Sequence, residues 1–170
     1  MEKDSLGDRC KRYEYSFRHQ LPQRMPVILR CDGKSFHNYT KGCKKPFDDS
    51  LIECMNDTAI ELCRNIQGAK LAYVQSDEIS ILIINHGLDA QPWFDNNIQK
   101  MVSISASIAS VTFTQNSWKI WGEKIVNAPS QETKLVTKPA YFDSRVFVAP
   151  KEGVNNLFLW RQNDATRNSI

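Results

Sequence analysis

The sequence contains no long uninterrupted run of apolar residues, and this absence excludes one broad class of protein. A membrane-spanning helix needs about 18 or more consecutive apolar residues, and no stretch of the chain meets that requirement. The N-terminal segment is rich in charged residues and lacks the apolar stretch of a secretory signal peptide. We therefore expect a cytoplasmic protein.

Cysteine usage gives no sign of a disulfide framework or a zinc site. The five cysteines form an odd count, and none of them belongs to a C-x-x-C pair. Cys54 and Cys63 fall within a helical pattern, where free thiols behave as small core residues. We expect neither disulfide bridges nor bound zinc.

The sequence also lacks internal repeats, low-complexity segments and a strong excess of one charge. Its 41% hydrophobic and 24% charged residues are ordinary for a globular protein. A chain of 170 residues suits one domain with a substantial core, which we assign to residues 1–170. The formal net charge of +3 permits nucleic-acid binding without indicating it.

What the sequence does contain is a clear succession of strand-like and helix-like segments. Apolar residues spaced along one helical face predict a helix from Asp48 or Asp49 to Ile66. Residues 93–114 fit a helix but also alternate as a strand would, and their length favours the helix. The other predicted elements are a helix over 4–19, strands over 26–31, 71–74, 79–84 and 142–150, a four-residue hairpin loop over 75–78, a long connection over 115–140 and a helix over 157–167.

From residue 26 onward, the predicted order is strand, helix, strand, strand, helix, strand. This βαββαβ order is that of the ferredoxin-like α+β fold, an antiparallel sheet with its helices on one face. We expect the other face to be open to a substrate. Since many unrelated proteins share this layout, the fold alone does not predict a function.

Acidic residues occur at the ends of two strands that this fold places side by side. Asp32 ends the first strand, and Asp77 and Glu78 lie between the second and the third. Paired strands lie about 4.8 Å apart, so these carboxylates could share Mg²⁺, which prefers oxygen ligands. Two ions about 3.5–4 Å apart would align an attacking oxygen with a phosphate. The same residues are also common in ordinary turns, and the sequence leaves both interpretations open.

The two neighbouring acids are not equivalent. Adjacent residues on a strand point to opposite faces, so both reach one metal site only if the turn bends the backbone. We predict Asp77 as the metal ligand and give Glu78 a supporting place.

The segment after Asp32 contains candidate phosphate-binding groups. Gly33 allows a ligand to approach the backbone closely, and Lys34, Ser35 and the amides of residues 33–37 could hold a triphosphate. His37 could contact a phosphate or a base. A solvated basic loop, with further lysines at positions 41, 44 and 45, and a solvated surface histidine are the alternatives.

Five segments, in order along the chain, resemble the tRNA-His guanylyltransferase family. The first is similar to the family's R-x-D-G-x-x-F-H…K-P…D segment and reads RCDGKSFHNYTKGCKKPFDD. The second resembles its Y-x-Q-S-D-E-x-S hairpin and reads AYVQSDEISILI. Three further segments resemble the family's W-F-x(5)-K, F-D-x-R-V-x-V-x-P and W-R-Q-x-D motifs. In the same order, they read PWFDNNIQK, FDSRVFVAP and LFLWRQNDATRNSI. Together the segments span nearly the whole chain.

The resemblance implies a palm-like catalytic domain, similar to that of ordinary polymerases, that extends RNA in the 3′→5′ direction. It implies that Asp32, the Gly33 carbonyl and Asp77 hold two Mg²⁺ ions, with Glu78 in the same acidic cluster. It also implies that a nucleoside triphosphate lies along residues 33–37. The nucleotide-binding residues implied in this way are Gly33, Lys34, Ser35, Phe36, His37, Asp48, Ser76, Lys100 and Arg145.

The implied reaction has two steps. ATP or GTP activates the 5′-phosphate of a tRNA, and the 3′-hydroxyl of an incoming nucleotide then attacks it. The segment from Asp164 to Ile170 departs from the H-I-N-N-L-Y-N run of eukaryotic members and resembles the bacterial and phage Thg-like branch, which repairs truncated tRNA 5′ ends on a template. The expected partners are tRNA, ATP, GTP and other nucleoside triphosphates, and the family suggests a homotetramer.

The chain stops where family members continue, so we expect it to lack the family's C-terminal part. One alternative is a nucleotide- or tRNA-binding module without catalysis. The other is a palm-fold nucleotide cyclase, although the chain lacks a G-G-D-E-F-type hairpin.

Overall fold

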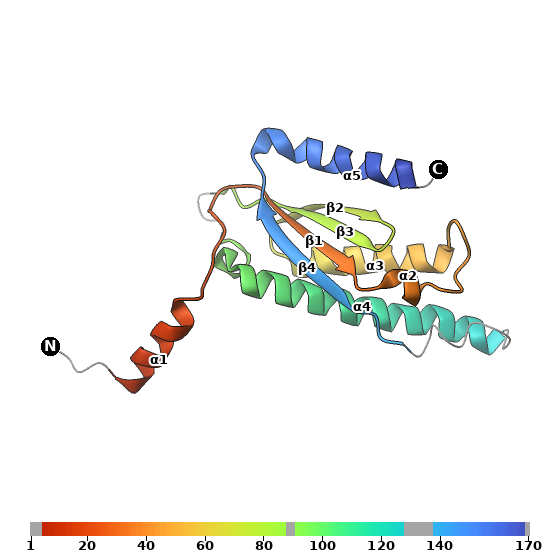
Figure 1. The fold of residues 1–170 in the computed structure, drawn as a ribbon, viewed down its shortest axis with the longest axis horizontal. Coiled ribbons are helices and arrows are strands. Elements are labelled where there is room, and N and C mark those ends of the chain that lie inside the picture. Colours follow the sequence, from red (N-terminus) through yellow and green to blue (C-terminus); the bar gives the residue numbers. More distant parts are fainter. Residues whose placement is uncertain (1–4, 88–90, 128–137, 169–170) are drawn as a thin grey trace.

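The computed structural model describes residues 5–87, 91–127 and 138–168, which form an α+β fold around one antiparallel sheet (Figure 1). Its strands are β1 (Val27–Gly33), β2 (Ala69–Gln75), β3 (Glu78–Ile83) and β4 (Phe142–Val148), in the order β2-β3-β1-β4. The predicted βαββαβ order is confirmed, and β1 and β3 are central neighbours as expected.

Two long helices connect the strands and cover one face of the sheet (Figure 1). They are α3 (Asp49–Asn65) and α4 (Ile98–Asn127). Every second residue of β1, namely Val27, Leu29 and Cys31, is buried against this layer and is at most 2% exposed. The other described helices are α1 (Leu6–Tyr15), α2 (Phe36–Tyr39) and α5 (Val154–Asn168), with short 3-10 turns η1 (Trp93–Asn96) and η2 (Lys151–Gly153).

Helix α4 is longer than the sequence predicts. The prediction of a connection over 115–140 is wrong for residues 115–127, which continue the helix. Phe113, Ser117 and Trp121 follow one another at helical spacing and are all buried. The polar Ser117 interrupts the helical spacing of apolar residues, so the sequence pattern does not predict this part of the helix. Its burial is tolerated because its hydroxyl donates to the Thr114 carbonyl oxygen (2.8 Å). Residues 128–137 lie outside the described residues.

The turn between β2 and β3 is shorter than predicted. Gln75 and Glu78 are paired in the strand ladder, so the connection has two residues, Ser76 and Asp77, instead of four. Ser76 adopts the left-handed conformation (φ 52°), which allows the chain to reverse within two residues. The tight turn fixes Asp77 directly beyond the ends of the strands.

Helix α5 lies over the sheet face opposite α3 and α4 (Figure 1). It begins at Val154, slightly before the predicted start at residue 157. Phe158 contacts Tyr73 of β2 with ring centroids 6.5 Å apart. The prediction of a wholly open second face is therefore wrong for the part that α5 covers.

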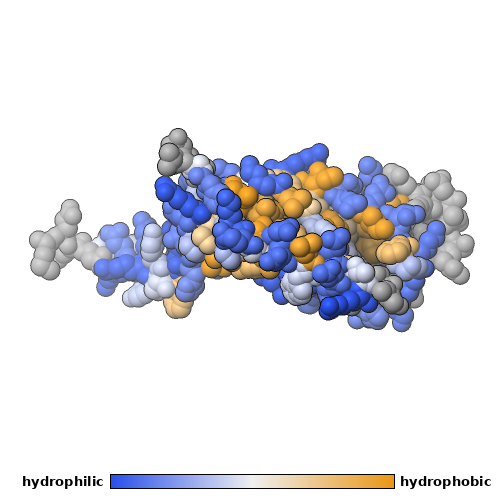
Figure 2. All heavy atoms as spheres, turned by 90° about the horizontal axis from the view of Figure 1, so that it is seen from above, coloured by the Kyte–Doolittle hydropathy of each residue, from blue (hydrophilic) through white to orange (hydrophobic). Residues whose placement is uncertain are grey.

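Two hollows border α5. One, of about 430 Å³, runs between β4 and α5 and is lined in part by Phe147, Leu157 and Trp160. Figure 2 views the molecule from this side and shows apolar side chains gathered among polar ones. The other, of about 340 Å³, lies on the outer side of α5. Neither is lined by the acidic residues at positions 32 and 77.

Helix α1 matches the helix predicted over 4–19, although it is shorter. It begins after the N-cap Ser5, and none of its residues is buried. Figure 1 shows that α1 extends away from the sheet. No helix in the described part of the chain is long and apolar enough to cross a membrane.

Candidate active site

A row of carboxylates crosses the sheet face opposite α3 and α4. Cross-strand partners in an antiparallel sheet point to the same face. Asp32 of β1 is paired with Glu78 of β3 on one side and with Asp143 of β4 on the other. Three strands thus contribute one acidic residue each to the same end of the sheet.

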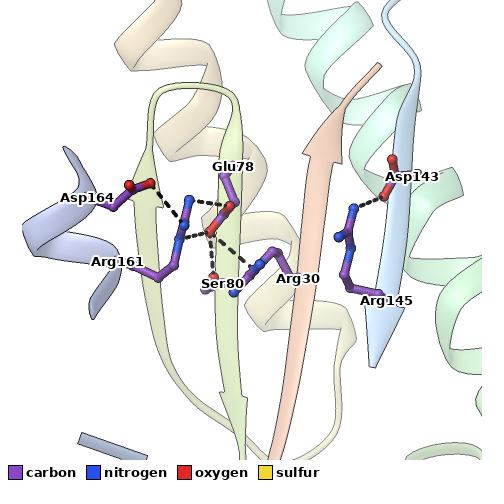
Figure 3. A network of polar contacts seen from close by, with 7 residues as sticks. All are labelled: Arg30, Glu78, Ser80, Asp143, Arg145, Arg161 and Asp164. Atoms are coloured by element: carbon purple, nitrogen blue, oxygen red, sulfur yellow. Dashed lines mark hydrogen bonds and ion pairs between the residues drawn. The ribbon is translucent and has the colours of Figure 1, made fainter. Parts of the chain in front are cut away.

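A row of basic and polar residues lies beside the carboxylates. Arg30 is paired with Ser80 and with Arg145, and residues two apart on a strand share a face. Three contacts join the rows (Figure 3): Arg30 Nε lies 3.3 Å from a Glu78 oxygen, the Ser80 hydroxyl donates to Glu78 (3.1 Å), and Arg145 lies 3.2 Å from Asp143. Of the acidic row, Glu78 and Asp143 therefore have ion-pair partners.

Asp77 joins the row from the β2–β3 turn. The Gly33 amide donates to the Asp77 carbonyl oxygen (3.0 Å), which holds the turn against the end of β1. Burial raises the pKa of Asp32, and the negative charges of Asp77, Asp143 and Glu78 raise it further, while Arg145 lowers it. The predicted proximity of Asp32 and Asp77 is therefore present in the structure.

The chemistry of these groups fits a divalent cation with oxygen ligands. Asp32 lies among carboxylates whose charges disfavour its ionisation, and a nearby cation would reverse that effect. The described residues contain no group of three or more His, Cys, Asp or Glu side chains arranged to hold a metal ion. A metal site here would therefore use Asp32, Asp77, the Gly33 carbonyl and oxygens of substrate or water, as Mg²⁺ commonly does.

Glu78 is occupied by contacts within the protein. Arg161 of α5 donates to both of its carboxylate oxygens (2.8 and 2.7 Å), and the Ser80 hydroxyl donates to one of them (3.1 Å). Only 8% of the residue is exposed. This arrangement suits the supporting place predicted for Glu78, and its inclusion among the catalytic residues stays a prediction.

The segment 33–37 follows the acidic row and is anchored by its aromatic residue. Phe36 is 3% exposed and contacts Phe113 and Phe142 in the core. Its ring is buried in the core, so a nucleotide-binding role for Phe36 would be limited to its main chain. Lys34, Ser35 and His37 are exposed on the same segment.

The main chain of this segment is available to phosphate only in part. The Gly33 amide donates to Asp77, and the Lys34 amide donates to the Tyr141 carbonyl oxygen (2.8 Å). The prediction that all amides of 33–37 cradle a triphosphate is therefore wrong for these two. The amides of residues 35–37 make no hydrogen bond to another described residue.

Comparison with known proteins shows the family. The family model described as tRNAHis guanylyltransferase matches residues 7–150. The chain belongs to the tRNA-His guanylyltransferase family. A solved structure of a bacterial tRNA(His) guanylyltransferase-like protein in complex with ATP is 49% identical, with a TM-score of 0.84, over 96% of this chain and 66% of that one. A solved structure of such a protein in complex with GTP is also 49% identical, with a TM-score of 0.83, over 97% of this chain and 73% of that one. The palm-like fold predicted from the resemblance is thereby confirmed.

More distant relatives of the family match nearly the whole chain. A probable tRNA(His) guanylyltransferase of Drosophila melanogaster is 30% identical over 95% of this chain and 54% of its own length. An uncharacterized protein of Acanthamoeba polyphaga mimivirus is 28% identical over 98% of this chain and 61% of its own length. The chain thus spans little more than half the length of these two curated relatives.

Two further residues implied by the family resemblance lie near the acidic row. Ser76 is exposed in the β2–β3 turn, next to Asp77. Arg145 of β4 is half-exposed and paired with Asp143. Lys100 is in the first turn of α4, and this helix begins near the end of the sheet where β1 begins (Figure 1). Asp32 belongs to the last two residues of β1. Among the described residues, no ion pair or hydrogen bond joins Lys100 to the acidic row.

Asp48 has a structural role, which the sequence leaves open between Asp48 and Asp49. It is the N-cap of α3, where one carboxylate oxygen accepts from the amides of Ser50 and Leu51. The other oxygen accepts from the Lys44 amide (3.0 Å), which ties the lysine-rich loop to the helix. A contact between Asp48 and a nucleotide base stays a prediction.

We expect Asp48→Ala to lower the free energy of unfolding by about 0.5–2 kcal/mol because α3 loses its N-cap. The matched control is Asp49→Ala, which removes an exposed carboxylate in the first turn of the same helix and no capping bond. Urea denaturation of the two variants measures the difference. An equal loss in both would contradict the capping role of Asp48.

Sequence reasoning missed three residues of the site, namely Arg30, Asp143 and Arg161. Asp143 and Arg145 lie two apart in the strand-like segment 142–150, so period-two alternation could have placed them on one face. The position of Asp143 opposite Asp32 depends on strand register, which the sequence does not give. The pairing of Arg161 with Glu78 depends on where α5 docks.

Proposed function

We propose that this chain is the catalytic palm domain of a 3′–5′ nucleotidyltransferase that activates a tRNA 5′-phosphate with ATP or GTP and adds nucleotides to the 5′ end. The observation that most directly supports this proposal is the row of carboxylates, with Asp77 held beside Gly33, in a chain that belongs to this family. Relatives of similar fold are described in complex with ATP and with GTP. Those complexes support nucleoside triphosphates as ligands of the same fold.

The residues that would hold Mg²⁺ are Asp32, Asp77 and the Gly33 carbonyl. Bound Mg²⁺, in the proposed number of two ions, would stabilise negative charge at the transferring phosphorus and lower the pKa of the attacking hydroxyl. Asp143 balances the charge of Arg145 in the absence of substrate. When a triphosphate arrives, Arg145 can turn from Asp143 to phosphate oxygens, which guanidinium groups bind well.

The exposed side chains of segment 33–37 complete the proposed nucleotide site. Lys34 and His37 are exposed on the segment that follows Asp32, and Phe36 anchors this segment in the core. An anchored segment that presents polar side chains orients a phosphate without losing much conformational freedom on binding. Catalysis in this proposal consists mainly of positioning and charge stabilisation.

We further propose template-dependent repair of truncated tRNA 5′ ends as the specific activity. The sequence of residues 164–170 resembles the bacterial and phage branch, and the solved bacterial relatives are 49% identical to this chain. The substrates would be tRNA, ATP, GTP and the other nucleoside triphosphates. A tetrameric assembly and a cytoplasmic location belong to the same proposal.

The test is a labelled, 5′-truncated tRNA incubated with the protein, Mg²⁺, ATP and all four nucleotides. We expect growth at the 5′ end that depends on pairing with the opposite acceptor strand and is lost in EDTA. Growth with an unpaired acceptor end would overturn the templated version. A cyclic nucleotide formed without RNA would indicate a cyclase, and binding without product would indicate a module without catalysis.

A further inference from the structure

Helix α5 contacts both residues that flank the Ser76–Asp77 turn. The turn consists of Ser76 and Asp77, and Gln75 and Glu78 stand at its two ends. Arg161 binds Glu78 through its guanidinium group (Figure 3). In the amide orientation that satisfies both contacts, Gln75 donates to the Arg161 carbonyl oxygen (2.7 Å) and accepts from the Ala165 amide (3.2 Å). One residue of α5 thus meets both ends of the turn.

The Arg161–Glu78 contact has the geometry of a strong, specific pair. Arg161 Nε and Nη2 reach different oxygens of Glu78 at 2.8 and 2.7 Å, which is a two-pronged, charge-assisted contact. The side chains are 14% and 10% exposed. Asp164, one turn further along α5, accepts from Arg161 (3.2 Å), and the Trp160 ring lies 4.8 Å from the guanidinium carbon. The guanidinium is therefore held from three directions.

Asp77 itself lacks such support. Among the described residues its side chain makes no hydrogen bond or ion pair, and only its carbonyl oxygen is held, by the Gly33 amide. The position of the Asp77 carboxylate therefore depends on how firmly the two ends of its turn are fixed. The contacts of α5 with Gln75 and Glu78 fix the two ends of the turn, in addition to the hydrogen bond from Gly33.

We propose that Arg161 is a positioning residue that fixes the Ser76–Asp77 turn beside Asp32 by binding Gln75 and Glu78. The proposal rests on the function proposed above, in which Asp32 and Asp77 hold divalent cations. It assigns Glu78 to the link between α5 and the turn: Arg161 and Arg30 balance its charge, and it is not a metal ligand. The docking of α5 then determines whether the metal site is formed.

The experiment compares the protein with Arg161→Met and Arg161→Lys. Arg161→Met keeps the length and apolar stem of the side chain but removes charge and donors, and Arg161→Lys keeps charge but not the two-pronged contact. The matched control is Arg64→Met, which removes an arginine from an exposed Arg64–Glu61 pair on α3. Thermal melts of all variants show which of them are folded.

The first readout is the affinity for Mn²⁺ alone, measured by electron paramagnetic resonance of the free ion. Loss of a residue that orients a metal ligand weakens metal binding by about 10–100-fold, and we expect that loss in Arg161→Met, a smaller loss in Arg161→Lys and none in Arg64→Met. The second readout is amide hydrogen exchange over residues 69–83, which should quicken around the turn. Unchanged Mn²⁺ affinity and unchanged exchange in a folded Arg161→Met protein would overturn the proposal.

A double-mutant cycle separates the link from direct ligation by Glu78. If Glu78 acts through Arg161, Glu78→Gln and the double variant with Arg161→Met should bind Mn²⁺ as weakly as Arg161→Met alone. Losses that add would show that Glu78 acts on the metal independently and would refute its assigned role. A wild-type protein that binds Mn²⁺ but does not extend tRNA would refute the proposed activity alone. A wild-type protein that extends tRNA, together with an Arg161→Met protein of unchanged Mn²⁺ affinity and amide exchange, would refute only the positioning role.

Discussion

Asp32→Asn is expected to reduce 5′-nucleotide addition on the order of 10³-fold, the scale of loss when a charge-stabilising group is removed from an active site. The amide keeps the size of the side chain but provides no negative charge for a divalent cation. The measurement is single-turnover extension of a labelled, 5′-truncated tRNA at saturating Mg²⁺. Asp57→Asn is the matched control because it neutralises an exposed carboxylate on α3, on the other side of the sheet. Activity retained in Asp32→Asn would remove this carboxylate from the mechanism.

The same substitution is expected to stabilise the metal-free protein. The pKa of Asp32 is raised above its ordinary value of 3.8 by burial and by neighbouring carboxylates, so the folded state holds the proton more tightly than the unfolded state. Stability contributed by the protonated form is therefore lost as pH rises from the unfolded pKa through the raised folded pKa. Above the folded pKa of Asp32 this destabilisation is fully present in the wild type, and it is absent in Asp32→Asn.

Thermal melts in EDTA between pH 4 and pH 8 measure this effect, and Mg²⁺ provides the second half of the test. Asp32→Asn should melt at a higher temperature than the wild type at neutral pH, with a flatter dependence on pH. Added Mg²⁺ should raise the melting temperature of the wild type more than that of the variant, because the ion binds the folded state. A lower melting temperature of the variant in EDTA would contradict the repulsion among the carboxylates.

The sequence is sufficient for the strand order and for the meeting of Asp32 with Asp77. Apolar runs mark β1 and β3 locally, and the βαββαβ order places these two strands side by side, which brings Asp32 and Asp77 together. The N-cap at Asp48 is local in the same sense, although only the structure distinguishes it from Asp49. Sequence patterns thus describe well the features that depend on one segment of chain or on a known order of strands and helices.

Two features that the sequence does not reveal each involve a buried polar residue. The Arg161–Glu78 pair joins residues 83 positions apart and exists only because α5 docks on the face that was expected to be open. The length of α4 depends on Ser117, whose burial breaks the apolar pattern although its hydroxyl is satisfied within the helix. In both cases a polar residue is buried, and its partner decides whether that burial is tolerated.

Gly33→Ala is expected to lower the free energy of unfolding by about 1–3 kcal/mol, the usual cost of inserting a methyl group into packed space. A Cβ at position 33 would lie 2.3 Å from Phe36 Cδ2 and 2.6 Å from Phe36 Cγ. The Phe36 ring cannot move freely, because it contacts Tyr39, Phe113 and Phe142 at centroid distances of 5.0, 5.2 and 5.0 Å. The end of β1 must therefore shift instead.

This shift would act directly on the proposed metal site. The Gly33 amide holds the Asp77 carbonyl oxygen, so a displaced Gly33 separates the turn from Asp32. Gly122→Ala is the matched control: a Cβ there has no neighbour within 4 Å, and alanine in the interior of α4 should add about 0.5–1 kcal/mol. Urea denaturation gives the stabilities, and Mn²⁺ titration gives the metal affinities. The ring of Phe36 explains why position 33 is glycine, in addition to any ligand that approaches the backbone. A Gly33→Ala protein with wild-type stability and metal affinity would show that this close contact has no consequence.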